Sequence, residues 1–265
     1  YRKMKEYKNK TILITGASSG IGETFAKKLN QYGARLILTA RSEDKLDELA
    51  LSMNDAIVIS GDLSKKEFPL ELYEKIKEKN REVDILINNA GFGFSGLFLD
   101  SPMKNYTEMM NVNVYSLTTL THLFLKDMVK RKDGGIINIS SLASFQSIPY
   151  FTIYAATKAF VTSFTKGLYE EYRRSGVKIL GVCPGYTKTN FNIRAKMSSK
   201  PMAGYLMSSE EVVDQSLKAY SKGKYLIING KINKFAKFIT SLMPTSWSLK
   251  LSRLIIKKGM DEKNW

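Results

Sequence analysis

Cysteine and histidine are almost absent from this chain of 265 residues, which holds one of each, Cys183 and His122. A single cysteine excludes an internal disulfide and suits a reducing compartment. No histidine, cysteine and carboxylate side chains cluster at the spacing of metal ligands, so the sequence predicts no metal site. His122 lies among Leu120, Leu123 and Phe124, and we interpret it as a packed structural side chain.

Long apolar runs are also missing. No run reaches the roughly 18 residues that a membrane span requires. The basic N-terminus lacks the apolar segment of a signal peptide. Hydrophobic residues make up 43% of the chain and charged residues 25%, which is typical of a globular protein with a sizeable core. We therefore expect a cytoplasmic protein.

Acidic residues are scarce, with 25 Asp and Glu against 41 Lys and Arg, for a net charge of +16. Between Gln215 and Met260 there are ten basic residues and no acidic one. Such a balance suits nucleic acids, anionic membranes or phosphorylated ligands. We do not expect nucleic-acid binding, because the lysines fall on amphipathic helices without a base-stacking platform.

Apolar runs typical of strands alternate with helical patterns along most of the chain. Strands are predicted at 11–15, 35–40, 56–60, 83–88, 135–140, 177–183 and 224–228, and helices near 21–32, 43–53, 67–80, 104–131, 152–175 and 209–222. Several strands are apolar without alternation, as expected for a parallel sheet buried on both faces. The alternation predicts an α/β fold with a doubly wound, mostly parallel sheet of seven strands and helices on both faces.

A glycine-rich turn, Thr15-Gly-Ala-Ser-Ser-Gly-Ile-Gly22, joins the first strand to the first helix. Its glycines allow a pyrophosphate to approach backbone N–H groups at a helix N-terminus. The predicted contacts are Gly16, Ser18, Ser19, Gly20, Ile21 and Gly22. At the end of the second strand, Arg41 stands where an acidic residue would select NAD, and its guanidinium suits a 2′-phosphate. We therefore predict NADP(H) as the cofactor.

Tyr154 and Lys158 are four residues apart on a predicted helix and so share one face. An ammonium about 4 Å from a tyrosinate, at an effective dielectric of ~20, stabilises it by roughly 4 kcal/mol. The predicted effect is a lowered tyrosine pKa, which would let the phenol exchange a proton with a carbonyl oxygen.

With these residues in order, the chain resembles the short-chain dehydrogenase/reductase family from about Lys10 to Ile228. The matching residues are the glycine-rich turn, Asp62-Leu63, Asn88-Asn-Ala-Gly91, Asn113, Ser141, Tyr154 with Lys158, and Pro184-Gly185. The resemblance implies a Rossmann-like fold and a catalytic set of Asn113, Ser141, Tyr154 and Lys158. It also implies cofactor contacts at Asp62, Leu63, Asn89, Ala90, Gly91, Tyr154, Lys158, Pro184, Gly185, Thr187 and Thr189.

The implied activity is reduction of a carbonyl, or oxidation of the matching alcohol, with Tyr154 as general acid or base. Ser141 would position the carbonyl oxygen, whereas Ser140 would point elsewhere, and Asn113 would complete a proton path. A non-catalytic protein that senses NADPH at a membrane surface is the alternative. The resemblance also implies a homo-oligomer, a dimer or tetramer, with contacts through helices near 104–131 and 152–175.

Substrate choice in the family lies largely between Asn190 and Met207 and in the C-terminus. In the first segment we expect a mobile flap. Its Phe191, Ile193 and Met197 suggest an apolar substrate, and Arg194, Lys196 and Lys200 could meet an anion.

Residues 231–265 lie beyond the catalytic domain, assigned to 1–230, and form a basic amphipathic extension that is not an independent domain. Ile232, Phe235, Ile239 and Leu242 share one helical face, Pro244 interrupts the helix, and Ser246 is a candidate cap for a second helix. Through residues 231–258 the extension could lie on an anionic membrane. Packing on the domain or on a twin subunit stays open as the alternative.

Overall fold

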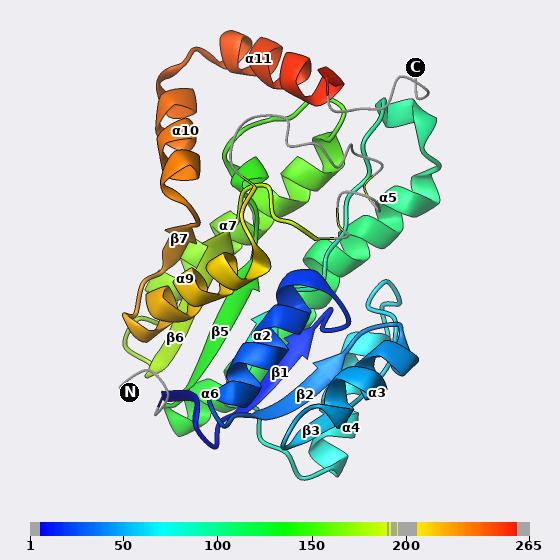
Figure 1. The fold of residues 1–265 in the computed structure, drawn as a ribbon, viewed down its shortest axis with the longest axis vertical. Coiled ribbons are helices and arrows are strands. Elements are labelled where there is room, and N and C mark those ends of the chain that lie inside the picture. The colour runs from blue at the N-terminus through cyan, green and yellow to red at the C-terminus, as the bar shows by residue number, and fades with distance from the viewer. Residues whose placement is uncertain (1–5, 190, 192–194, 196–205, 259–265) are drawn as a thin grey trace.

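The computed structural model describes residues 6–189, 191, 195 and 206–258 (Figure 1). Seven strands form one sheet in the order β3-β2-β1-β4-β5-β6-β7, and all neighbours are parallel. The strands are β1 (Thr11–Thr15), β2 (Arg35–Thr39), β3 (Ala56–Val58), β4 (Ile85–Asn88), β5 (Gly134–Ile139), β6 (Val177–Cys183) and β7 (Leu226–Ile228).

Helices cover both faces of the sheet, as Figure 1 shows. The α-helices are α2 (Gly20–Gln31), α3 (Glu43–Leu51), α4 (Phe68–Glu78), α5 (Met103–Met110), α6 (Leu117–Arg131), α7 (Thr152–Glu171), α9 (Ser209–Ser221), α10 (Lys231–Leu242) and α11 (Thr245–Lys258). Short 3₁₀ helices span Phe98–Asp100 and Leu142–Phe145. The predicted doubly wound α/β fold is confirmed. The interpretation of His122 as a packed side chain is wrong, because this residue is exposed on α6.

One hydrophobic cluster on each face of the sheet explains why the strands lack polar alternation. Ile12 and Ile14 of β1 pack toward α2, α3 and α9 on one face, while Leu13 packs toward α4 and α6 on the other. Successive side chains of a strand point to opposite faces of the sheet. A sheet covered on both sides therefore requires apolar residues at successive positions of its strands.

The order of the strands creates a ligand site. From β1 the chain adds β2 and β3 on one side, then returns to place β4 on the other side of β1. The carboxyl ends of β1 and β4 therefore meet at a topological switch point, where ligands bind in open α/β sheets.

The helix predicted over 104–131 is interrupted. A π-helical segment, Asn111–Ser116, separates α5 from α6 and turns Asn113 and Ser116 inward, where both side chains are fully buried. A π segment has a wider turn than an α-helix and often marks a functional site. A search for the ordinary helical period cannot detect it.

Over residues 231–258 the C-terminal extension forms two helices: α10 contacts the 3₁₀ helix Leu142–Phe145, and α11 lies across the end of the molecule toward which the strands point (Figure 1). Pro244 separates α10 from α11, as predicted. Ser246 was expected to cap the second helix, but α11 begins at Thr245 and places this serine inside its first turn. Over the described ranges, no helix combines the length and apolarity needed to cross a membrane.

Candidate active site

The glycine-rich turn forms a cradle between β1 and α2. Gly16 and Gly20 have φ angles of 64° and 61°, a region that glycine occupies without strain. A Cβ at Gly16 would lie 2.9 Å from Ala90 Cα, and one at Gly20 would lie 3.0 Å from Thr189 Cγ2. The first N–H groups of α2 have no partner within the helix. The turn therefore offers bare backbone donors at a positive helix end, which suits a phosphate.

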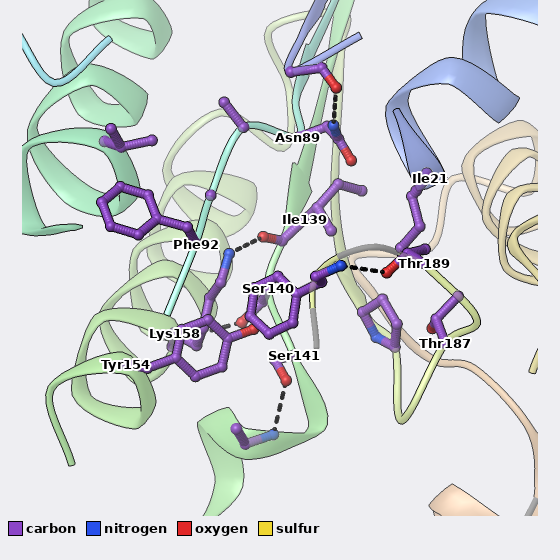
Figure 2. A pocket seen from close by; sticks show the side chains of 18 of the residues that line it. Ile21, Asn89, Phe92, Ile139, Ser140, Ser141, Tyr154, Lys158, Thr187 and Thr189 are labelled. Carbon is purple, nitrogen blue, oxygen red and sulfur yellow. Dashed lines mark hydrogen bonds between the residues drawn. The ribbon is translucent and has the colours of Figure 1, made fainter. Parts of the chain in front are cut away.

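Asn89 fastens this turn to the end of β4. Its Nδ2 donates to the carbonyl oxygens of Thr15 at 2.9 Å and Gly16 at 3.1 Å, and Figure 2 shows the amide beside the turn. The Thr15 hydroxyl accepts from the N–H groups of Asn89 and Ala90. At Gly22 a Cβ would collide with the Asn89 amide and the Gly16 carbonyl. Glycine at position 22 therefore allows the Asn89 amide and the Gly16 carbonyl to pack closely against α2.

A cavity of about 370 Å³ extends from the cradle across the carboxyl ends of the strands. Of the residues predicted for the site, it is lined by Gly16, Ser18, Ser19, Gly20, Ile21, Arg41, Asp62, Leu63, Asn89, Ala90, Gly91, Ser141, Tyr154, Lys158, Pro184, Gly185, Thr187 and Thr189. Two predicted residues, Gly22 and Asn113, do not line it. The structure therefore brings nearly the whole predicted set into one space.

Tyr154 and Lys158 project from α7 into this cavity. They are 7% and 4% exposed, and Figure 2 shows them side by side. Lys158 Nζ donates to the Ile139 carbonyl oxygen at 2.9 Å and lies 5.8 Å from the centre of the Tyr154 ring. Burial lowers the pKa of Lys158 to about 8. An ammonium has three donors, so the bond to the Ile139 carbonyl oxygen leaves others for a ligand.

The pKa of Tyr154 differs from the sequence-based expectation. Burial raises this pKa well above its ordinary value, and the nearby Ser141 hydroxyl opposes the shift. The expected lowering by Lys158 is wrong for this structure, because desolvation of the phenolate dominates and the ammonium is held on the Ile139 carbonyl. At neutral pH the phenol keeps its proton, which is the state a proton donor needs.

Ser140 and Ser141 are adjacent but have different surroundings. The Ser140 hydroxyl is buried and donates to the Lys158 carbonyl oxygen at 2.8 Å, which holds α7 against β5. Ser141 caps the 3₁₀ helix by accepting from the Ala143 N–H at 3.1 Å. Its hydroxyl lines the cavity beside Tyr154. Ser140 also lines the cavity, but its hydroxyl points toward α7, away from Tyr154, as expected.

Asn113 lies behind the cavity and has no exposed surface. Its amide Nδ2 donates to the Phe92 carbonyl oxygen and to Thr157 Oγ1, each at 3.0 Å, and its Oδ1 accepts from the Phe92 N–H at 3.1 Å. A Cβ at Gly91 would lie 3.1 Å from Lys158 Nζ and 3.2 Å from Asn113 Oδ1. Glycine at 91 therefore keeps open the space between Asn113 and Lys158.

The other half of the cavity is largely apolar and was mostly missed by sequence reasoning. It is lined by Leu142, Gln146, Ile148, Phe151, Tyr186, Phe191, Ser252, Ile255 and Ile256. Phe191 was predicted, whereas Ile193, Arg194, Lys196, Met197 and Lys200 lie outside the described residues. No sequence signal places α11 in this wall, because its position depends on the path of the chain after β7.

Comparisons with known proteins agree with the motifs. A family profile described as short chain dehydrogenase matches residues 10–199. An uncharacterized oxidoreductase of Staphylococcus saprophyticus is 35% identical over 76% of this chain and 90% of its own length. The human very-long-chain 3-oxoacyl-CoA reductase is 36% identical over 71% of this chain and 63% of that enzyme.

Among solved structures, a short-chain dehydrogenase from Sphingobium yanoikuyae in complex with NADPH has a TM-score of 0.78 and 29% identity, and the match covers 89% of this chain and 97% of that one. A bulky-bulky ketone specific alcohol dehydrogenase from Comamonas testosteroni has a TM-score of 0.74 and 28% identity, over 89% and 96% of the two chains. This chain belongs to the short-chain dehydrogenase/reductase family and is an oxidoreductase.

Proposed function

We propose that the protein is an NADP(H)-dependent reductase of apolar carbonyl compounds. The observation that carries the proposal is a single cavity with a glycine cradle at one end, an apolar pocket at the other, and Ser141, Tyr154 and Lys158 between them. The NADPH-bound structure of the Sphingobium relative supports the choice of cofactor.

The residues of the cradle fit a dinucleotide phosphate. Gly16 and Gly20 leave room for the pyrophosphate, and Asp62 and Leu63, which the family resemblance gives as cofactor contacts, line the same cavity. Arg41 is exposed at the end of β2, in the same wall. Its planar guanidinium would pair with a 2′-phosphate.

When bound, the cofactor would supply a hydride to the carbonyl carbon. Tyr154 then gives its proton to the carbonyl oxygen, which becomes more basic than a phenolate as negative charge develops there. Ser141 holds that oxygen with its hydroxyl. Lys158 would bind ribose hydroxyls of the cofactor with its remaining donors, and Asn113 fixes the Phe92 backbone and the open space at Gly91.

The pocket supports an apolar substrate, because Ile148, Phe151, Phe191, Ile255 and Ile256 line it. The very-long-chain 3-oxoacyl-CoA compounds in the name of the human relative are therefore the first class to test. Bulky ketones, named for the Comamonas relative, are the second.

The experiment is a screen for NADPH oxidation across ketones and 3-oxoacyl thioesters graded by chain length and polarity. We expect turnover that increases with apolar chain length, and NADPH preferred over NADH. NADPH binding without turnover of any carbonyl would instead support the alternative, a non-catalytic NADPH sensor.

We further propose that the protein is a cytoplasmic homo-oligomer, a dimer or tetramer, that associates peripherally with membranes through residues 231–258. Tyr115 and Phe160, on the two elements expected to form the dimer contact, remain 42% and 39% exposed, which supports the oligomer. Residues 231–265 belong with the catalytic domain 1–230. In support of this, Ile256 packs in one cluster with Tyr154.

A further inference from the structure

The amphipathic helix α10 has its apolar side chains on the outside. The side chains that are partly covered are polar: Asn233 donates to the Asn229 carbonyl oxygen at 2.7 Å, and Lys237 Nζ lies 5.8 Å from the centre of the Phe145 ring. The exposed side chains are Ile232, Phe235, Phe238, Ile239 and Leu242, which are 41–68% exposed. A helix that served only to pack on its own domain would turn these residues inward.

Helix α11 has two different faces. On one side Ser252 and Ile256 are 5% and 6% exposed, and both line the cavity that holds Tyr154. On the other, Trp247 and Leu254 are 64% and 60% exposed. One helix thus separates the substrate pocket from the molecule's outer surface, with apolar residues on both sides.

We define the C-terminal apolar surface as Ile232, Phe235, Phe238, Ile239, Leu242, Trp247, Leu251 and Leu254. The helices that carry it also contain seven basic residues, Lys231, Lys234, Lys237, Lys250, Arg253, Lys257 and Lys258, and no acidic one. A second copy would bring two such sets of like charges together, which disfavours pairing. An anionic bilayer complements both the charges and the apolar side chains.

We propose that the C-terminal apolar surface docks on an anionic bilayer, and that the pocket behind α11 takes its carbonyl substrate from that bilayer. The entry of substrate from the bilayer rests on the proposed reductase function, whereas the docking does not depend on that function. A substrate that leaves the bilayer beside α11 enters an apolar pocket without crossing much water. This route suits a long-chain ketone or acyl thioester and gives the extension a role in substrate supply.

Flotation of the full chain with phosphatidylcholine vesicles, with and without phosphatidylserine, tests the docking. We expect wild type to float with the anionic vesicles and to be released by high salt. The double variant Phe235→Ser/Leu242→Ser should lose at least tenfold in vesicle affinity. Leu51→Ser, which changes a leucine 89% exposed on α3, is the matched control and should float like wild type.

Two outcomes would overturn the docking: wild type that ignores anionic vesicles at low salt, or a double variant that binds them as well as wild type does. Sedimentation velocity on the same variants tests the alternative, in which a second copy of the chain covers the C-terminal apolar surface. If the double variant has a smaller assembly and unchanged vesicle binding, the surface is a contact between copies and the proposal is wrong.

Kinetics test the route of the substrate. We expect the double variant to lose at least tenfold in kcat/KM for a long-chain ketone held in anionic vesicles, and to stay within twofold for a water-soluble short-chain ketone. Equal rates of wild type and double variant on the vesicle substrate would contradict the route alone. Failure of wild type to reduce either ketone would contradict the reductase function, and flotation would still decide the docking.

Discussion

Burial acts on Tyr154 and Lys158 in opposite senses, and both shifts favour the uncharged side chain. The tyrosine holds its proton more firmly than in water, while the lysine holds its proton less firmly. For a reductase this combination is useful, because the phenol stays protonated until a strong base forms at the substrate oxygen. The lysine contributes through the ligands it can bind more than through a lowered tyrosine pKa.

The pKa of Lys158 predicts a dependence of stability on pH. Its folded value of about 8 lies below the unfolded value of 10.5, so between these values the unfolded chain binds the extra proton and the folded protein does not. The free energy of unfolding of wild type, relative to Lys158→Met, should therefore rise between pH 8 and 10.5, by about 3 kcal/mol. Urea denaturation of both proteins across this range would measure it. A difference that is flat or falls with pH contradicts a depressed pKa.

Arg41 accounts for the proposed cofactor preference. Arg41→Asp should cut kcat/KM for NADPH by roughly 10- to 100-fold, through loss of charge-assisted hydrogen bonds to the 2′-phosphate. It should also favour NADH, because a carboxylate can accept from the ribose hydroxyl. Steady-state kinetics with both cofactors provide the measurement, and Lys45→Asp on α3 is the control for charge alone. Unchanged selectivity in Arg41→Asp would remove the argument for the phosphate.

At the level of secondary structure, the π-helical segment between α5 and α6 contacts the active site through Asn113, which bonds the Phe92 backbone. Asn113→Ala would remove the side-chain partner of the Phe92 N–H and carbonyl groups. It would also remove one hydrogen bond of the Thr157 hydroxyl, which would keep its bond to the Tyr154 carbonyl oxygen. We expect a loss of about 1–3 kcal/mol in stability, together with a lower kcat, because the space beside Lys158 changes. Asn111→Ala, which removes a bond to the Ser64 carbonyl oxygen, is the matched control. It should lose stability but keep kcat, and a kcat loss of equal size in both variants would contradict a local role for Asn113.

The strands and the glycine turn could be predicted from the sequence because each depends on local chemistry. Ile12, Leu13 and Ile14 need apolar surroundings on both faces, and Gly16 needs a positive φ. The π segment could not be predicted, since Asn113 turns inward only through contacts with Phe92 and Thr157. The predicted pKa shift of Tyr154 was wrong for a similar reason. Spacing on a helix gives the position of the lysine, but it does not reveal that Phe151 and Phe191 exclude water from the phenol. The centres of their rings lie 4.3 and 5.3 Å from the centre of the Tyr154 ring.

On the scale of the whole molecule, the two halves of the cavity have different origins. The cofactor half comes from motifs within residues 10–199, the part that the family profile matches. The apolar half also draws on α11, which lies beyond that match and reaches the pocket after two further helices. The lining of the apolar half therefore depends on a tertiary arrangement that motif spacing does not encode.

The proposed oligomer predicts a change in the size of the assembly. Phe160 stacks on Phe164 on α7, with ring centres 5.6 Å apart, and is 39% exposed. Phe160→Glu should place a charge in the expected contact and shift the protein toward monomer, as measured by sedimentation equilibrium. Leu51→Glu on α3 is the control. The same assembly in Phe160→Glu and wild type would show that this face of α7 is not the contact.

In the proposed reaction, Tyr154 gives its proton to the substrate oxygen. The direct measurement is single-turnover reduction of a soluble ketone by Tyr154→Phe, with NADPH affinity measured separately by fluorescence titration. We predict a loss of about 10²- to 10⁴-fold in rate, with NADPH affinity nearly intact. Tyr106→Phe changes another buried tyrosine of the same cluster, one whose hydroxyl bonds the Phe98 carbonyl oxygen outside the cavity, and it should keep its rate. A Tyr154→Phe enzyme within tenfold of wild type would contradict the assignment.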